Sequence, residues 1–125
     1  MSELRQIERH GVLVIAAEGR IDAAISPRLE ELLRQALAGG QTRLVVDLAA
    51  VTYVSSSCLR ALLVGARQAR EQKGDLKLCA LAPRVRQIFA LAGFDQVFEL
   101  WDSCQQAVSS FAAPPGGSAH TWASD

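Results

Sequence analysis

Three consecutive serines, Ser55 to Ser57, stand between an apolar run that ends at Val54 and a second apolar run that begins at Cys58. Hydroxyl groups at the junction of a buried strand and a helix can do three kinds of work. A hydroxyl can cap the helix by accepting a hydrogen bond from a free backbone N–H group. It can also act as a nucleophile, or accept a phosphoryl group beside the positive end of the helix dipole.

The sequence gives unequal support to these three roles. A helix that starts within the run needs a cap, and Ser56 or Ser57 is the predicted N-cap. A catalytic serine needs a base, and the chain holds only His10, in a predicted turn, and His120, near the C-terminus. The stretch lacks a Gly-x-Ser-x-Gly elbow and the glycines of a phosphate-binding loop. A serine hydrolase and a nucleotide-binding module are therefore kept only as alternatives.

The composition of the 125-residue chain indicates one globular domain. Half of the residues are hydrophobic and only 6% are aromatic, so a core of aliphatic side chains is expected. The 13 basic and 13 acidic residues cancel, which leaves no basic surface for nucleic acid or an anionic membrane. No apolar run suits a bilayer span or a signal peptide, so no membrane insertion and a cytoplasmic location are expected.

The three cysteines, Cys58, Cys79 and Cys104, are far apart in the sequence and form no Cys-x-x-Cys pair. This spacing argues against a disulfide framework and against a zinc site. Each cysteine lies among apolar neighbours, where a thiol packs as a small hydrophobic group. Three buried structural cysteines, and no metal site, are predicted.

The elements that must position the serines alternate between strands and helices. Apolar runs predict strands at 4–9, 12–19, 42–48, 76–81 and 97–100. Helical spacing predicts helices that begin at Ser26, after the serines, at Pro83, and at Asp102 or Ser103. Ser26 is expected to cap the first of these, ahead of Pro27.

This order predicts a single α/β domain over residues 1–111. The alternation after the first two strands requires a mainly parallel sheet with an N-terminal antiparallel strand and about four helices. Asp47 falls inside a buried strand and is expected to bond a nearby backbone group, because an unpaired buried charge is costly. Residues 112–125, with Pro-Pro and Gly-Gly, are predicted to form a flexible tail.

Three segments resemble the STAS domain of bacterial anti-sigma-factor antagonists: EGRIDAAISPRL, LVVDLAAVTYVSSSCLRALL and LAPRVRQIFALAGFDQVFEL. The family pattern is roughly G-x-[IL]-D-x-x-x-[SATV]-P, then [LV]-D-[LF]-S-x-V-x-[FY]-[IVM]-D-S-[ST]-G-L, then L-x-G-[LF]. The match keeps its register from about Leu4 to Phe111. The resemblance implies a STAS-like fold and a protein that is not an enzyme and needs no cofactor.

The resemblance also implies a partner and a switch. In the family, the unphosphorylated protein binds an anti-sigma factor, often a serine kinase of the histidine-kinase-like ATPase fold, and so frees the sigma factor. The kinase phosphorylates the serine or threonine before the family's glycine, and a phosphatase reverses the reaction. That acceptor falls on Ser57, with Ser56 as the alternative. An accessory STAS subunit that binds a transporter ATPase is the alternative function within the same fold.

Two departures from the family pattern lie next to the predicted acceptor. Ser55 stands in place of the aspartate, which removes a charge from the surface that a kinase would read. Cys58 stands in place of the glycine, which adds a side chain where a partner could require close approach. The residues predicted to bind the partner surround these positions: Asp22, on the family's loop aspartate, Ser55, Ser56, Ser57, Cys58 and Arg60.

Overall fold

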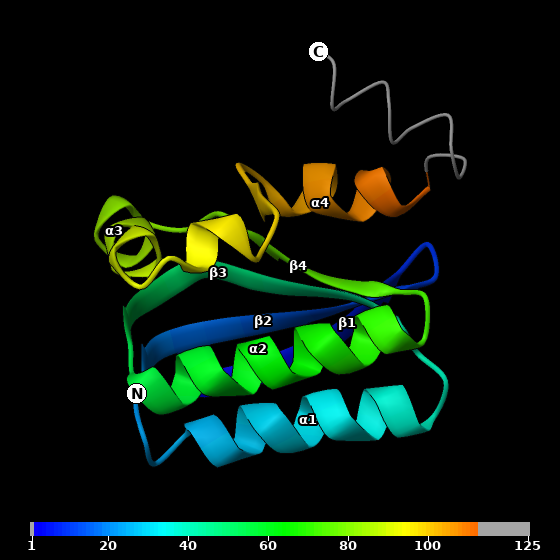
Figure 1. Cartoon of the computed structure of the whole chain (residues 1–125), viewed down its shortest axis with the longest axis horizontal. Coiled ribbons are helices and arrows are strands. Elements are labelled where there is room, and N and C mark those ends of the chain that lie inside the picture. Colours follow the sequence, from blue (N-terminus) through cyan, green and yellow to red (C-terminus); the bar gives the residue numbers. More distant parts are fainter. Residues whose placement is uncertain (1, 113–125) are drawn as a thin grey trace.

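A computed structural model describes residues 2–112 and shows a five-stranded sheet with helices on both faces (Figure 1). The strands lie in chain order across the sheet. Their bounds are Glu3–Arg9 (β1), Val12–Ile21 (β2), Arg43–Val54 (β3), Asp75–Cys79 (β4) and Leu100–Trp101 (β5). β1 pairs with β2 in antiparallel orientation, and all other pairs are parallel. The predicted mixed sheet is confirmed.

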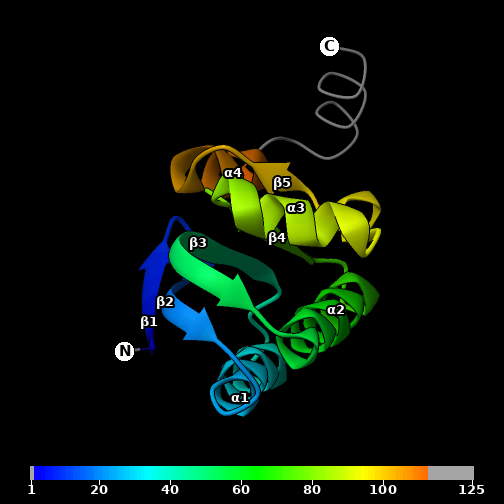
Figure 2. The ribbon, with the colours of Figure 1, turned by 90° about the vertical axis from the view of Figure 1, so that its left-hand side faces the viewer.

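The helices follow the strands in the predicted alternation. Their bounds are Ser26–Ala38 (α1), Ser56–Glu71 (α2), Pro83–Leu91 (α3) and Cys104–Phe111 (α4), with a 3₁₀ turn at Phe94–Gln96 (η1). Figures 1 and 2 show α1 and α2 side by side on one face of the sheet and α4 on the opposite face. No helix within residues 2–112 has the length and apolar character needed to cross a bilayer. Residues 113–125, most of the predicted tail, lie outside the described residues, so the boundary at 111 stays a prediction.

The N-terminal hairpin follows from its turn residues. His10 and Gly11 both have positive φ, 53° and 79°, as the two central residues of a type I′ turn require. β1 is an edge strand in which only Leu4 is buried. The next strand, β2, buries side chains on both faces because it lies between β1 and β3. The expectation that this apolar run occupies the covered interior of the sheet is confirmed.

Two cores, one on each face of the sheet, hold the helices in place. The larger core lies under α1, α2 and α3 and is mostly aliphatic, as the composition predicts. The smaller one lies under α4, and its buried members are Val12, Val14, Val45, Cys79, Ala107 and Val108. The apolar stripe of α2 faces the larger core, whereas Arg60, Arg67 and Arg70 are exposed.

The segment after α3 differs from the predicted strand at 97–100. Gly93 adopts a left-handed φ of 77°, and the chain then forms η1, after which the N–H groups of Val97 and Phe98 both donate to the carbonyl of Phe94 at 3.0 Å. This turn places Phe94 and Phe98 against Phe89, with ring centroids 6.4 and 6.2 Å from the Phe89 ring. Burial of these rings overrides the strand-like alternation, and β5 begins only at Leu100.

Candidate functional site

The predicted site residues gather where the carboxyl ends of β2 and β3 lead into α1 and α2 (Figure 2). The two strand ends are joined directly, because the N–H group of Ser55 donates to the carbonyl of Ile21 at 3.0 Å. The carboxyl edge of a parallel sheet is where α/β proteins commonly bind their ligands and partners. The fold thus brings the loop that contains Asp22 next to the three serines.

Asp22 shapes the loop ahead of α1. Its Oδ1 atom accepts hydrogen bonds from the N–H groups of Ala24 and Ile25 at 3.0 and 3.2 Å. Its carbonyl accepts from the N–H group of Ser26 at 2.9 Å and from the Ser26 hydroxyl at 2.7 Å. The expectation that Ser26 caps α1 is therefore wrong, because its hydroxyl donates to a carbonyl and the N-cap position is Ile25.

The cap of α2 is Ser55, and not Ser56 or Ser57 as predicted. Ser55 has the extended backbone of an N-cap, and its Oγ atom accepts from the N–H group of Cys58 at 3.1 Å. Serine and aspartate are about equally good at this position. Ser55 can therefore cap α2 as the family's aspartate could, but it brings no negative charge.

Three hydroxyls meet at the junction and form a cluster that we call the serine triangle: Ser26, Ser55 and Ser57. The Oγ atoms of Ser55 and Ser57 are 3.0 Å apart, Ser57 donates to Ser26 at 3.2 Å, and Ser26 and Ser55 are 3.3 Å apart. Ser26 is buried, and the other two are half-buried. Sequence reasoning missed Ser26 as a member of the site, although it occupies the small residue before proline in the family pattern.

Ser56 lies outside the serine triangle. It is the first residue of α2 and is exposed, and its hydroxyl has no hydrogen-bond partner in the part of the chain that the structure describes. The three consecutive serines therefore differ: one caps the helix, one is exposed, and one, Ser57, joins α2 to α1.

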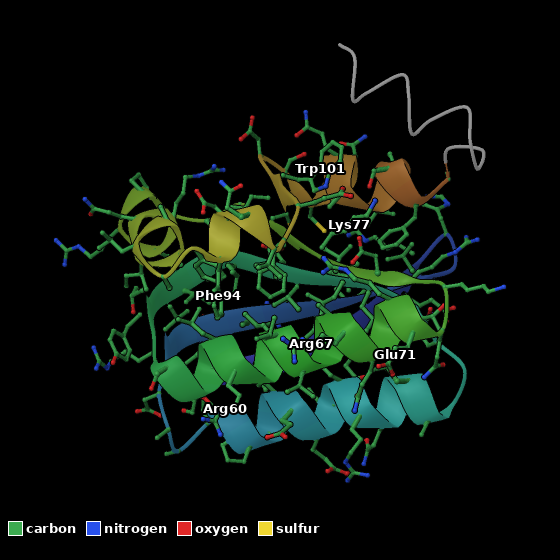
Figure 3. All side chains as sticks on the ribbon, viewed as in Figure 1. Arg60, Arg67, Glu71, Lys77, Phe94 and Trp101 are labelled. Atoms are coloured by element: carbon green, nitrogen blue, oxygen red, sulfur yellow. The ribbon has the colours of Figure 1, made fainter. Side chains whose placement is uncertain are left out.

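The start of α2 keeps a positive potential. The first N–H groups of a helix lack partners within the helix, and its N-terminal end carries about half a positive charge. No acidic residue lies in the first turn of α2 to offset this potential. Arg60 is exposed on the next turn and lies near this end of the helix (Figure 3).

A second cation, missed by sequence reasoning, lies at the same edge of the sheet. Arg20 and Tyr53 are register partners at the ends of β2 and β3, and the Arg20 guanidinium lies 4.3 Å from the centre of the Tyr53 ring. Arg20 is exposed and Tyr53 is half-buried. The sequence signal that could have indicated this pair is the aromatic position of the family pattern, which Tyr53 occupies. Arginine and tyrosine are enriched where proteins bind one another.

Cys58 presents no surface to a partner. Its side chain is 0% exposed and packs in the larger core, and burial raises the pKa of its thiol to about 12. The side chain that stands in place of the family's glycine therefore points into the core and does not obstruct the close approach of a partner. We leave Cys58 out of the proposed partner surface, and the side chains of Asp22, Ser55, Ser56, Ser57 and Arg60 remain in it.

The Cys58 thiol should make the domain sensitive to alkaline pH. Because its pKa is raised from 9.0 to about 12, the stability that it contributes is complete below pH 9 and is lost as pH rises towards 12. Between pH 8 and 11 the wild type should lose roughly 2–3 kcal/mol more free energy of unfolding than Cys58→Ala. Urea unfolding of both proteins across this range measures the difference. Parallel pH curves would contradict the assignment.

A hydrolytic site receives no support from the described residues. His10 lies in the turn before β2, whereas the serines lie beside the last residue of this ten-residue strand. At roughly 3.3 Å per residue the two ends are far beyond hydrogen-bond reach. His120, the other histidine, lies outside the described residues.

Comparison with known proteins assigns the chain to a family. The family model described as "Mlab, STAS domain" matches residues 5–102. The chain belongs to the STAS domain family. The predicted resemblance is confirmed, and Ser55 and Cys58 are two of the positions at which this STAS domain departs from the family pattern.

Two curated relatives and one solved structure of similar length are named as anti-sigma factor antagonists. BtrV of Bordetella bronchiseptica, named as a candidate anti-sigma factor antagonist, is 36% identical over 101 residues, which cover 81% of this chain and 87% of BtrV. The anti-sigma-F factor antagonist RsfB of Mycobacterium tuberculosis is 28% identical over 102 residues, 82% of this chain and 83% of RsfB. The structure of an anti-sigma factor antagonist from Mycobacterium paratuberculosis superposes with a TM-score of 0.82 at 26% identity, covering 90% and 96% of the two chains.

Proposed function

We propose that this STAS domain is an anti-sigma factor antagonist that acts by binding an anti-sigma factor. The observation that carries the proposal is the match to BtrV, which extends over most of both chains at 36% identity. The geometry is consistent with a binding protein, because Arg20, Ser56 and Arg60 are exposed at this edge of the sheet and no histidine accompanies the serines among the described residues.

The proposed partner surface lies over the starts of α1 and α2. It consists of Asp22, Ser55, Ser56, Ser57 and Arg60, to which we add the stacked pair of Arg20 and Tyr53. Asp22 takes part through the loop that it orders, because its Oδ1 atom already bonds two backbone N–H groups. Exposed Arg20 and Arg60 would meet acidic groups of the partner and set its orientation.

We further propose that Ser57 is the switch hydroxyl. A kinase partner would transfer the γ-phosphoryl group of ATP to the Ser57 Oγ atom, releasing ADP and the hydroxyl proton. The product would carry roughly −1.5 to −2 charges beside the positive end of α2. It would also replace the hydrogen bond from Ser57 to Ser26, which now joins the two helices. A partner surface built for a neutral hydroxyl would then no longer fit.

Affinity capture from the native organism tests this function. The wild-type chain and Ser57→Asp are immobilised at equal density, and the captured proteins are identified by mass spectrometry. An anti-sigma factor, in particular a serine kinase of the histidine-kinase-like ATPase fold, should be retained by the wild type alone. Equal capture of the anti-sigma factor by both proteins would support the binding function but contradict the proposal that Ser57 is the switch. Recovery of a transporter ATPase instead would favour the alternative of an accessory transporter subunit.

A further inference from the structure

A side-chain cluster on the opposite face of the sheet from α1 and α2 is independent of the proposed partner surface. Asp47 on β3 and Cys79 on β4 are register partners in the parallel pairing of these strands. Cys104 is the first residue of α4, which covers this face (Figure 1). A carboxylate oxygen of Asp47 and the Sγ atoms of the two cysteines all lie within 4.8 Å of one another. The fold therefore unites cysteines that are far apart in the sequence.

The surroundings of the cluster are apolar on one side and open on the other. Cys79 is 0% exposed, whereas Asp47 and Cys104 are half-buried. Trp101, which Figure 3 shows beside α4, packs on the same small core as Cys104. A cation could thus enter from the Asp47 and Cys104 side and rest against a wall of low polarity, where its attraction to anionic ligands is strong.

The hydrogen bonds of the cluster leave oxygen and sulfur atoms that can act as ligands to a cation. The Oδ1 atom of Asp47 accepts from the N–H group of Ala49 at 3.0 Å, which confirms the predicted backbone bond and fixes the orientation of the carboxylate. The Cys79 thiol donates a long hydrogen bond of 3.8 Å to the Val46 carbonyl, and it also lies within hydrogen-bond reach of the Cys104 thiol. In known metal sites, hydrogen bonds to the ligating side chains, like the one that Asp47 accepts from Ala49, orient the ligands.

The dimensions and the ligand types suit zinc. Bonds of about 2.3 Å to sulfur and 2.0–2.2 Å to oxygen in a tetrahedron place the ligand atoms about 3.5–3.8 Å apart. Starting from separations within 4.8 Å, the side chains need to move by only about 1 Å. Two thiolates and one carboxylate carry three negative charges, which a divalent cation largely offsets, and two sulfur ligands favour zinc over magnesium or calcium.

We propose that Asp47, Cys79 and Cys104 form a binding site for a divalent cation of the zinc class. Binding forms two metal–sulfur bonds and one metal–oxygen bond, releases the two thiol protons to solvent, and leaves a fourth position for water. The ion joins β3, β4 and the first turn of α4. The bound ion would hold these elements together around the small core, and its binding does not depend on the proposed anti-sigma activity.

Metal titration of the full-length chain without an affinity tag tests the site. Zn²⁺ is added in competition with a chromophoric chelator, and Cd²⁺ is added in parallel to observe thiolate-to-cadmium absorption in the ultraviolet. One ion per chain with a thiolate band is expected. Loss of a residue that only hydrogen-bonds to a metal ligand typically weakens metal binding by roughly 10–100-fold. Cys104→Ser and Asp47→Asn change ligands themselves, so each should weaken binding by more than this. Cys58→Ala, which removes a buried thiol outside the cluster, should bind as the wild type does.

A second measurement needs no variant and so does not depend on a mutant's folding. Zn²⁺ should protect the Cys104 thiol, the one half-buried cysteine of the three, from alkylation by iodoacetamide. The proposal is overturned if cadmium binds without a thiolate band, if Cys104→Ser binds zinc as tightly as the wild type, or if zinc leaves Cys104 alkylation unchanged. Formation of a Cys79–Cys104 disulfide in air that persists with zinc present would also overturn it.

Discussion

The substitution Ser57→Asp should weaken binding to the purified anti-sigma partner by about 30-fold or more. A charge left unpaired in a buried interface costs about 2–5 kcal/mol, and 2 kcal/mol corresponds to roughly a 30-fold change in Kd. The domain itself should stay folded, because a carboxylate in the first turn of a helix is stabilising by about 0.3–1 kcal/mol. Calorimetric titration measures the affinity, and thermal unfolding of the variant shows that the loss arises at the interface.

The matched control is Ser56→Asp, which places the same charge one residue earlier. Ser56 lies on the same proposed partner surface, but it is exposed and takes no part in the serine triangle, so its variant should lose less affinity than Ser57→Asp. Ser57→Ala, which removes the hydroxyl without adding charge, should bind close to wild type. Wild-type affinity for Ser57→Asp would reject the switch at this position. An equal loss of affinity from both aspartate variants would mean that a negative charge at either position of the helix start is sufficient to disrupt partner binding.

Sequence pattern predicted the strands and helices because burial imposes a period. The apolar run of β2 required a strand covered on both faces, and the stripe along α2 required a helix on one face. The ends of these elements were harder to place. β3 continues to Val54, beyond the predicted end at 48, because its second half pairs with the end of β2 through two irregularities in register.

The detailed chemistry of the site could not be predicted, because it depends on atoms from separate elements. A run of three serines does not show that Ser55 caps α2 while Ser57 reaches Ser26 on α1. Likewise, the spacing of cysteines along the chain argued against a metal site. Only the register of β3 with β4 and the position of α4 place Cys79 and Cys104 beside Asp47.

Phe89→Ala should be among the most damaging single substitutions, since it removes the centre of the aromatic cluster that holds α3 and η1 on the sheet. The Phe89 ring is 0% exposed and meets Phe94 and Phe98 edge-on, at interplanar angles of 70° and 76°. Truncation should cost about 3–5 kcal/mol of unfolding free energy, a large part of the roughly 5–15 kcal/mol typical of a domain. Leu91→Ala, two residues later and 84% exposed, should change it by less than about 0.5 kcal/mol. Urea unfolding compares the two variants, and similar midpoints would show that α3 is not anchored through this ring.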